Sequence, residues 1–191
     1  MSRFHTSALW QSVAVMTAAA LPAQVTIAAT YLTTEKAQRA LFPEAEAFDA
    51  LALAPSSEQQ QAVLKLAGPQ AAHGNLLAWR ARHGGSTVGY VFIDEVVGRQ
   101  DFITYAVGID AAGKLRPVEI LEYRESHGGE IRNRRWLAQF NGRSAQGELR
   151  FRTDIKNIAG ATLSSEHVTA GVRRILALWE TLLKPAAGGS T

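Results

Sequence analysis

Hydroxyl side chains and small residues come together in one stretch, residues 154–165, which is followed at once by a helical pattern. Three of its side chains carry a hydroxyl group near the helix: Thr162, Ser164 and Ser165. Gly160 and Ala161 also lie there, and such small residues let the backbone approach a ligand closely. The first N–H groups of a helix have no partner within the helix and lie at the positive end of its dipole. The stretch therefore suits an anion such as phosphate.

The same residues have a simpler interpretation. A helix that begins near Glu166 would be capped by Ser164 or Ser165, with Gly160 in the tight turn before it. Taken alone, the stretch favours this cap over a phosphate site. The rest of the chain must decide between the two.

Other residues that could do chemistry are few. The chain has no cysteine, which excludes disulfides, thiolate metal sites and cysteine nucleophiles. Its five histidines are scattered, and the common catalytic and metal-binding signatures are missing or weak. His127 stands out because it lies in a glycine-containing loop between Glu125 and Glu130, where it is either a solvated residue or a ligand contact. We predict no catalytic residue and no metal ligand.

The composition fits one globular domain with a short appendage. The chain has 191 residues and a formal net charge of +3, with acidic and basic residues well mixed. This balance gives little support for nucleic acid as a partner, and we predict none. The local basic run Arg132, Arg134 and Arg135 would spread around a helix and form a solvated face.

The N-terminus predicts export. No Lys, Arg, Asp or Glu occurs between Arg3 and Glu35, and the interval is rich in apolar residues. A basic start before an apolar run is typical of a signal sequence or a single membrane anchor. We expect residues 1–30 to be one of these, with a signal sequence slightly favoured, and the rest to lie in the periplasm or on the outer face of the cytoplasmic membrane. Residues 31–185 would form the domain and residues 186–191 a disordered tail.

The pattern along the chain predicts an α+β fold, with an antiparallel, strongly twisted sheet flanked by helices. The expected helices are Glu35–Phe42, a second from a Ser57/Gln60 capping box to Gly68, a short one over Ile131–Phe140 and a last one from Glu166 to Pro185. The expected strands are 77–82, 86–94, 102–109, 115–123 and 148–152, with a surface connection over 43–55.

The turn Gly160-Ala161-Thr162, followed by Leu163-Ser164-Ser165 and a helix, resembles the flavinylation motif of the FMN-binding domain family. That family includes the FMN-carrying subunits of the Rnf and sodium-pumping NADH:quinone oxidoreductase complexes. Further segments match in the family's order: residues 31–37, 41–43, 107–110, 125–128 and 136–140. The resemblance covers roughly residues 31–183.

The resemblance implies a covalent flavoprotein. Thr162 would carry FMN through a phosphoester made by a separate flavin transferase, with the phosphate at the helix N-terminus. The implied cofactor-binding residues are Thr162, Gly160, Ala161, Leu163, Ser164, Ser165, Glu125, Ser126, His127 and Lys156. Of these, the loop from Glu125 to Gly128 would border the isoalloxazine ring. The protein would orient the flavin and tune its potential.

Two residues depart from the family's motif. Ala159 stands where Ser or Thr is usual, and Lys156 stands where an acid is common, with Asp154 two positions upstream as a substitute. Lys156 could instead pair with phosphate or with the charge of reduced flavin. We therefore predict an electron-transfer flavoprotein with membrane or periplasmic redox partners, a redox carrier or oxidoreductase subunit more than a stand-alone enzyme. The alternatives are a non-redox module that binds FMN or a phosphate ligand non-covalently and a structural interaction domain.

Overall fold

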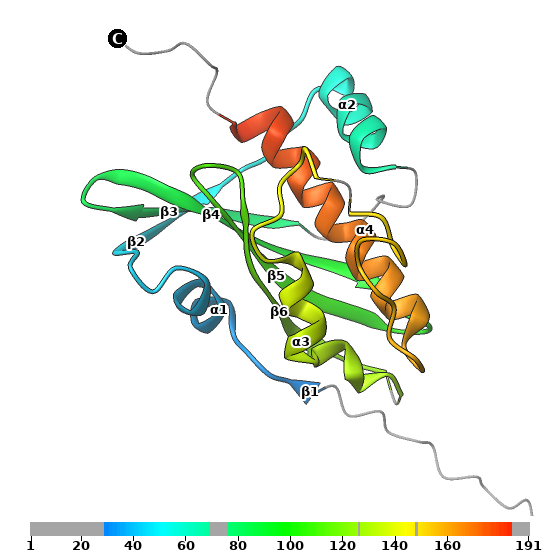
Figure 1. Cartoon of the computed structure of the whole chain (residues 1–191). Helices are drawn as coiled ribbons and strands as arrows, with labels where there is room; N and C mark the ends of the chain where they lie inside the picture. Colours follow the sequence, from blue (N-terminus) through cyan, green and yellow to red (C-terminus); the bar gives the residue numbers. More distant parts are fainter. Residues whose placement is uncertain (1–28, 69–75, 126, 148, 185–191) are drawn as a thin grey trace, which may run out of the picture.

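The computed structural model describes residues 29–68, 76–125, 127–147 and 149–184. They form a mixed fold in which helices lie on both sides of one sheet (Figure 1). The strands are β1 (Ala29–Thr30), β2 (Ala47–Leu51), β3 (Leu77–His83), β4 (Ser86–Val97), β5 (Phe102–Asp110) and β6 (Leu115–Tyr123). The helices are α1 (Thr34–Leu41), α2 (Ser57–Ala67), η2 (Gly129–Arg132), α3 (Arg134–Leu137), η3 (Ala138–Phe140), α4 (Thr162–Leu178) and η4 (Trp179–Leu183).

The six strands form one sheet in the order β1-β6-β5-β4-β3-β2, and every neighbouring pair is antiparallel. Short turns join β3 to β4, β4 to β5 and β5 to β6, as the predicted hairpins require. The register pairs Val97 with Phe102 and Ile103 with Tyr123. The turn between β4 and β5 therefore lies at the same end of the sheet as the loop that follows β6.

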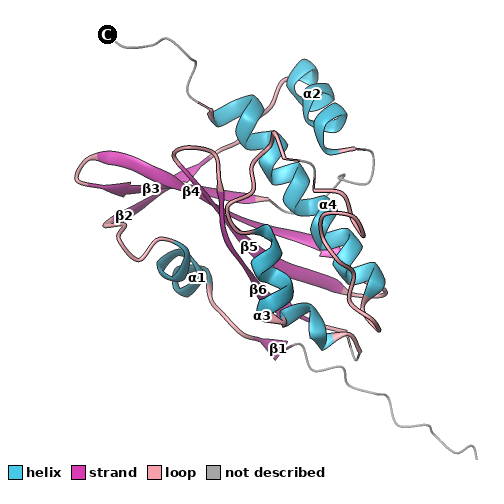
Figure 2. Ribbon diagram, in the orientation of Figure 1, coloured by secondary structure: helices cyan, strands magenta, loops and turns pink. Residues whose placement is uncertain are grey.

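Side chains along the central strands point alternately to the two faces of the sheet, and this divides the core into two layers. In β4, Phe92 packs in the cluster beneath α4, whereas its neighbours Val91 and Ile93 pack in the cluster beneath α1. Successive side chains of a strand point to opposite faces of the sheet, so each face receives its own apolar surface. In Figure 2, α4 crosses one face with α3 beside it, and α1 lies against the other.

A buried polar network fixes α4 to the sheet. The Tyr105 hydroxyl donates to Asp94 Oδ2 at 2.6 Å, and the Arg174 guanidinium of α4 donates to the same oxygen. Asp94 is fully buried and the Arg174 side chain is 12% exposed. Gly171 lies against the Tyr105 hydroxyl, which leaves no room for a Cβ atom. The network holds the helix whose first turn carries Thr162.

The prediction of an α+β fold with an antiparallel sheet is confirmed, with several local corrections. The supposed connection over 43–55 contains the edge strand β2, and the capping box is formed by Ser56 and Gln59. The described part of the predicted strand 148–152 makes only the isolated bridge between Phe151 and Ile155. Backbone hydrogen bonds from Asp154 and Ile155 back to Arg150 make this segment a turn instead.

Several expectations concern the ends of the chain. The apolar segment before Ala29 and the tail after Lys184 lie outside the described residues. Ala29 and Thr30, expected to end the apolar segment, form β1 and pair with Tyr123 and Glu122. Among the helices that the structure describes, none has the length and apolar character needed to span a membrane.

Candidate functional site

The N-terminus of α4 differs from its prediction. The helix begins at Thr162 and not near Glu166, and its N-cap residue is Ala161, which has no side-chain cap. Ser164 and Ser165 are therefore inside the first turn and do not cap it. The Ser165 hydroxyl donates to the Thr162 carbonyl oxygen at 2.9 Å, so it is used within the helix. The simpler interpretation of the stretch as a serine cap is wrong.

The first turn of α4 leaves backbone donors available. Within the described chain, the N–H groups of Thr162, Leu163 and Ser164 donate to no backbone acceptor, while the next N–H, of Ser165, donates to the Ala161 carbonyl oxygen at 2.9 Å. Gly160 precedes them with φ of +85° and open space on the side of a Cβ atom. Unpaired donors at the positive end of a 17-residue helix are the arrangement that binds anions.

A cavity of about 370 Å³ opens at this turn. Its lining comes from two walls. The helix wall consists of Gly160, Ala161, Thr162, Leu163 and Ser164, and the sheet wall consists of Arg99, Glu125 and His127. Thr162 is half-buried, and Leu163 is 47% exposed at the rim. The volume falls within the range of small-ligand sites.

Tyr123 connects the two walls beneath the cavity. Its hydroxyl donates to the carbonyl oxygen of His127. A Cβ atom on Gly128 would come within 2.6 Å of that hydroxyl and 3.3 Å of Ala161 Cβ, so the loop and the turn are packed tightly. Burial is the main cause that raises the pKa of Tyr123, and its hydrogen bond with Ser164 acts in the opposite direction. The hydroxyl therefore stays protonated at neutral pH and can keep donating.

Glu125 has a structural partner that its sequence position did not reveal. Its Oε1 atom accepts hydrogen bonds from the backbone N–H groups of Arg99, Gln100 at 3.0 Å and Asp101 at 3.4 Å. Gly98, which begins this turn, has no room for a Cβ atom because Glu125 Oε1 lies against it. The carboxylate thus fastens the turn between β4 and β5 to the loop after β6.

The remaining predicted residues lie away from the cavity or outside the described chain. Lys156 is exposed in a separate, open cleft with Arg135 and Trp136. Its carbonyl oxygen accepts from Trp136 Nε1 at 2.5 Å, and its N–H donates to Gln139. Ser165 is buried behind the helix wall, and Ser126 lies outside the described residues.

The substitute acid Asp154 is held by a neighbour. Its carboxylate accepts from Arg150 Nε at 3.0 Å and from the Arg150 backbone at 2.9 Å. This contact with Arg150 is the main cause that lowers the pKa of Asp154. The carboxylate does not line the cavity at Thr162.

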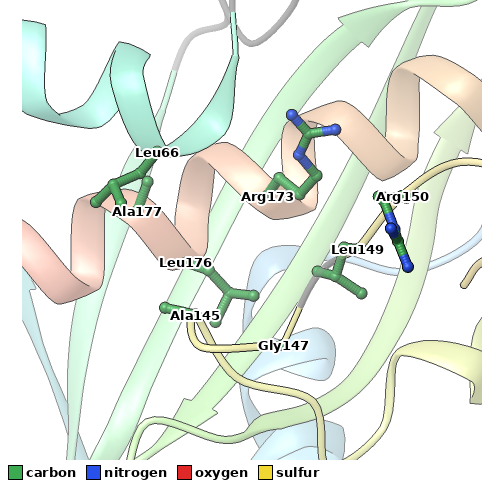
Figure 3. A pocket seen from close by; sticks show the side chains of 8 residues that line it. All are labelled: Leu66, Ala145, Gly147, Leu149, Arg150, Arg173, Leu176 and Ala177. Carbon is green, nitrogen blue, oxygen red and sulfur yellow. The ribbon is translucent and has the colours of Figure 1, made fainter.

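A second cavity, of about 260 Å³, lies between α2, α4 and the loop that ends at Arg150 (Figure 3). Leu66, Leu149 and Leu176 give it an apolar character. Its cations have partners in the fold: Arg173 donates to the Ala67 carbonyl oxygen, and Arg150 pairs with Asp154. It contains none of the residues predicted to bind a cofactor.

Arg99 was not among the residues predicted from the sequence to bind a cofactor. The signal was nevertheless present, because both central hairpins were predicted. Antiparallel pairing of two consecutive hairpins brings the turn at 98–101 beside the loop that follows Tyr123. The side chain of Arg99 could then have been placed opposite the Thr162 turn.

The segment that forms this site matches a known protein family. Residues 98–177 match the family described as FMN-binding domain. Every residue that lines the cavity at Thr162 falls within this segment. The resemblance predicted from the Gly-Ala-Thr turn is confirmed by this match, which includes the turn itself.

A curated relative is similar over a longer stretch. It is a subunit of the Na(+)-translocating ferredoxin:NAD(+) oxidoreductase complex of Acetobacterium woodii, and it is 26% identical over 158 residues. The alignment covers 78% of this chain and 74% of the relative. The similarity therefore extends beyond the segment matched by the family and includes elements that precede the cavity.

Proposed function

We propose that this protein is an extracytoplasmic electron-transfer flavoprotein that carries FMN covalently through a phosphoester to Thr162 Oγ1. The observation that carries the proposal is the position of Thr162, a half-buried residue at the N-terminus of α4, in a cavity within the segment that matches the FMN-binding domain family. Bound FMN would supply the chemistry of accepting and releasing electrons. The protein's own residues bind, orient and shield the group.

The residues present fit a phosphate bound at Thr162. The free N–H groups of Thr162, Leu163 and Ser164 would donate to phosphate oxygens, and the helix dipole would favour the negative charge of a diester. Asn157 Nδ2 lies 3.5 Å from Thr162 Oγ1, at the outer limit of a hydrogen bond. Gly160, two residues before Thr162, has open space where a side chain would begin.

Attachment requires a partner enzyme. Thr162 Oγ1 would form the new bond to the FMN phosphorus and lose its proton, while the phosphoanhydride bond of a flavin dinucleotide held by a separate flavin transferase breaks and releases a nucleoside monophosphate. No side chain of the cavity need act as the catalyst, which is consistent with the absence of catalytic motifs in the sequence. Ala159 and Lys156 depart from the family's motif where the transferase would act.

The relative's place in a complex suggests the partners. Its name describes a subunit of an oxidoreductase complex that translocates sodium ions. By this similarity we propose that the present protein exchanges electrons with membrane or periplasmic redox partners. The apolar run before Glu35 supports a position outside the cytoplasmic membrane.

In-gel fluorescence of denatured protein tests the covalent linkage. The chain is expressed together with a flavin transferase, in wild-type form and with Thr162→Val or Thr162→Ser. The wild type should fluoresce and Thr162→Val should be dark, while Thr162→Ser, which keeps a hydroxyl group, should retain part of the signal. A wild-type protein that is yellow when native but dark after denaturation would instead favour a non-covalent FMN-binding module.

A further inference from the structure

Arg99 lines the cavity at Thr162, and its side chain has no partner among the described residues. Arg99 is exposed at the turn between β4 and β5 and faces the cavity. Throughout the described chain, its side chain makes no hydrogen bond, ion pair or ring contact. Most other arginines of the described chain are engaged, for example Arg116 with Glu44 and Arg124 with Glu122.

The turn that carries Arg99 is held in place by hydrogen bonds to its backbone. The Glu125 carboxylate accepts three backbone N–H groups of residues 99–101, and Gly98 N–H closes the turn on the Asp101 carbonyl oxygen at 2.8 Å. Charge-assisted hydrogen bonds of this kind are stronger than neutral ones. The backbone of Arg99 is therefore fixed, while its side chain is left available.

The opposite wall carries the groups that would bind the phosphate. Free N–H groups at the start of α4 and the Thr162 hydroxyl lie together on the helix side. A flavin attached there would have one other charged part, the pyrimidine end of its ring, when it is reduced. Uptake of two electrons and one proton leaves one negative charge on that end. A planar guanidinium with several N–H donors suits a ring edge that carries carbonyl oxygens and negative charge.

We propose that Arg99 pairs with the pyrimidine end of the flavin ring and favours its reduced, anionic form, and that Glu125 is the positioning residue that holds Arg99 there. This proposal rests on the proposed function, since it needs a flavin at Thr162. In this proposal, the positive charge near the flavin ring comes from the turn between β4 and β5. Lys156, which the sequence offered for that role, lies in a different cleft.

The test is an anaerobic redox equilibrium of the full chain, expressed with a flavin transferase, in which dithionite supplies the electrons and a dye of known potential reports the balance. At the potential where the wild type is half reduced, Arg99→Gln should lower the ratio of reduced to oxidised flavin about threefold, and Arg99→Glu about tenfold. Arg99→Lys, which keeps the charge, should stay within about twofold. High salt should shrink these differences, because the site is exposed.

The matched control is Arg134→Gln, which removes another exposed arginine that lies away from the cavity. Its ratio should equal that of the wild type. An Arg99→Gln ratio that also equals the wild type would overturn the proposal. So would an equal drop in both variants, because net charge alone would then explain it.

Glu125 needs a separate measurement, since its own charge also acts on the flavin. Glu125→Gln should increase amide hydrogen exchange at residues 99–101. Its effect on the redox ratio should differ between the wild-type and Arg99→Gln backgrounds, because part of it acts through Arg99. Equal effects in the two backgrounds would contradict the positioning role.

Failure of the proposed function is distinguishable from failure of this inference. Fluorescence of the denatured band shows whether the flavin is linked covalently to the chain. The redox ratio shows the effect of Arg99 on any flavin that the native protein retains, covalent or not. A dark denatured band from a native protein that retains flavin would overturn the covalent linkage, and the effect of Arg99 on the redox ratio could still be measured. A protein that retains no flavin at all would overturn both.

Discussion

The two walls of the cavity are held in different ways. The helix wall belongs to α4, which is fixed to the sheet by the buried network of Asp94, Tyr105 and Arg174. In the sheet wall, the half-buried carboxylate of Glu125 binds the backbone of an exposed turn, and the Tyr123 hydroxyl donates to the His127 carbonyl oxygen. A buried charge network resists rearrangement, whereas a solvent-accessible turn opens at lower cost. The helix wall should therefore be the more stable of the two, and the sheet wall should open more readily.

The largest effect should come from breaking the anchor of the helix wall. Asp94→Ala would leave Arg174 without its counter-charge and the Tyr105 hydroxyl without its acceptor, both inside the protein. We expect a loss of about 3–5 kcal/mol in the free energy of unfolding, measured by urea denaturation. The control Asp49→Ala, which breaks the exposed pair with Arg82, should cost less than about 1 kcal/mol. Equal losses of unfolding free energy in the two variants would show that the buried ion pair stabilises the protein no more than the exposed one.

Loss of the carboxylate that holds the sheet wall should have a smaller and local effect. Glu125→Ala removes the acceptor of three backbone N–H groups at residues 99–101. We expect a local cost of about 2 kcal/mol, seen as faster amide hydrogen exchange in this turn but not in α4. Glu130→Ala, at an exposed position in the following 3-10 helix, is the control. Faster exchange across the whole protein would show that the two walls are not independent.

Alkaline pH should weaken the helix wall through Tyr105. Burial, and next the charge of Asp94, raise the pKa of Tyr105 well above its ordinary value of 10.0, while Arg174 acts in the opposite direction. Above pH 10 the unfolded chain therefore loses a proton that the folded protein keeps. The free energy of unfolding should fall as pH rises through this range, by at most about 1.4 kcal/mol per pH unit from this group.

Tyr105→Phe provides the comparison for that titration. The variant is less stable overall, but its decline above pH 10 should be shallower than that of the wild type. The difference between the two slopes, measured by denaturation at several pH values, isolates the contribution of Tyr105. Parallel slopes would show that the folded state does not hold this proton.

The smallest effect is expected at the mouth of the cavity. Gly160 has φ of +85°, and apart from its chain neighbours no described residue has an atom within 4 Å of a Cβ atom placed there. Gly160→Ala should therefore cost only the strain of the left-handed backbone, about 1 kcal/mol. Gly128→Ala should cost more, because its Cβ atom would meet the Tyr123 hydroxyl at 2.6 Å. Thermal unfolding measures both costs, and Gly128→Ala should lower the melting temperature more than Gly160→Ala does. A larger drop for Gly160→Ala would contradict the packing described for the two glycines.

The helix wall could be predicted from the sequence because it is one contiguous segment. Gly160, Ala161 and Thr162 stand side by side in a recognisable motif. The start of the helix could not be placed, since Ser164 and Ser165 both suit a cap and the pattern alone does not choose between them. In the fold, Ala161 takes the cap position and the serines are buried in the first turn.

The sheet wall was harder to predict because its residues come from two distant segments. Glu125 and His127 were recognised by resemblance, but the hydrogen bonds of Glu125 depend on which turn lies beside it. Arg99 has no local signal, since an exposed arginine in a turn is common. Lys156 was given a role by its position in the motif, yet it lines a different cleft, together with Trp136 and Asn157.

Mass spectrometry of the tryptic peptide 157–173 tests the central claim most directly. This peptide contains Thr162 together with Ser164, Ser165 and Thr169. From protein expressed with a flavin transferase, we predict a peptide heavier by one FMN less one water, with fragment ions that place the added mass on Thr162. An unmodified peptide from a yellow protein, or added mass on one of the other hydroxyl residues, would contradict the account.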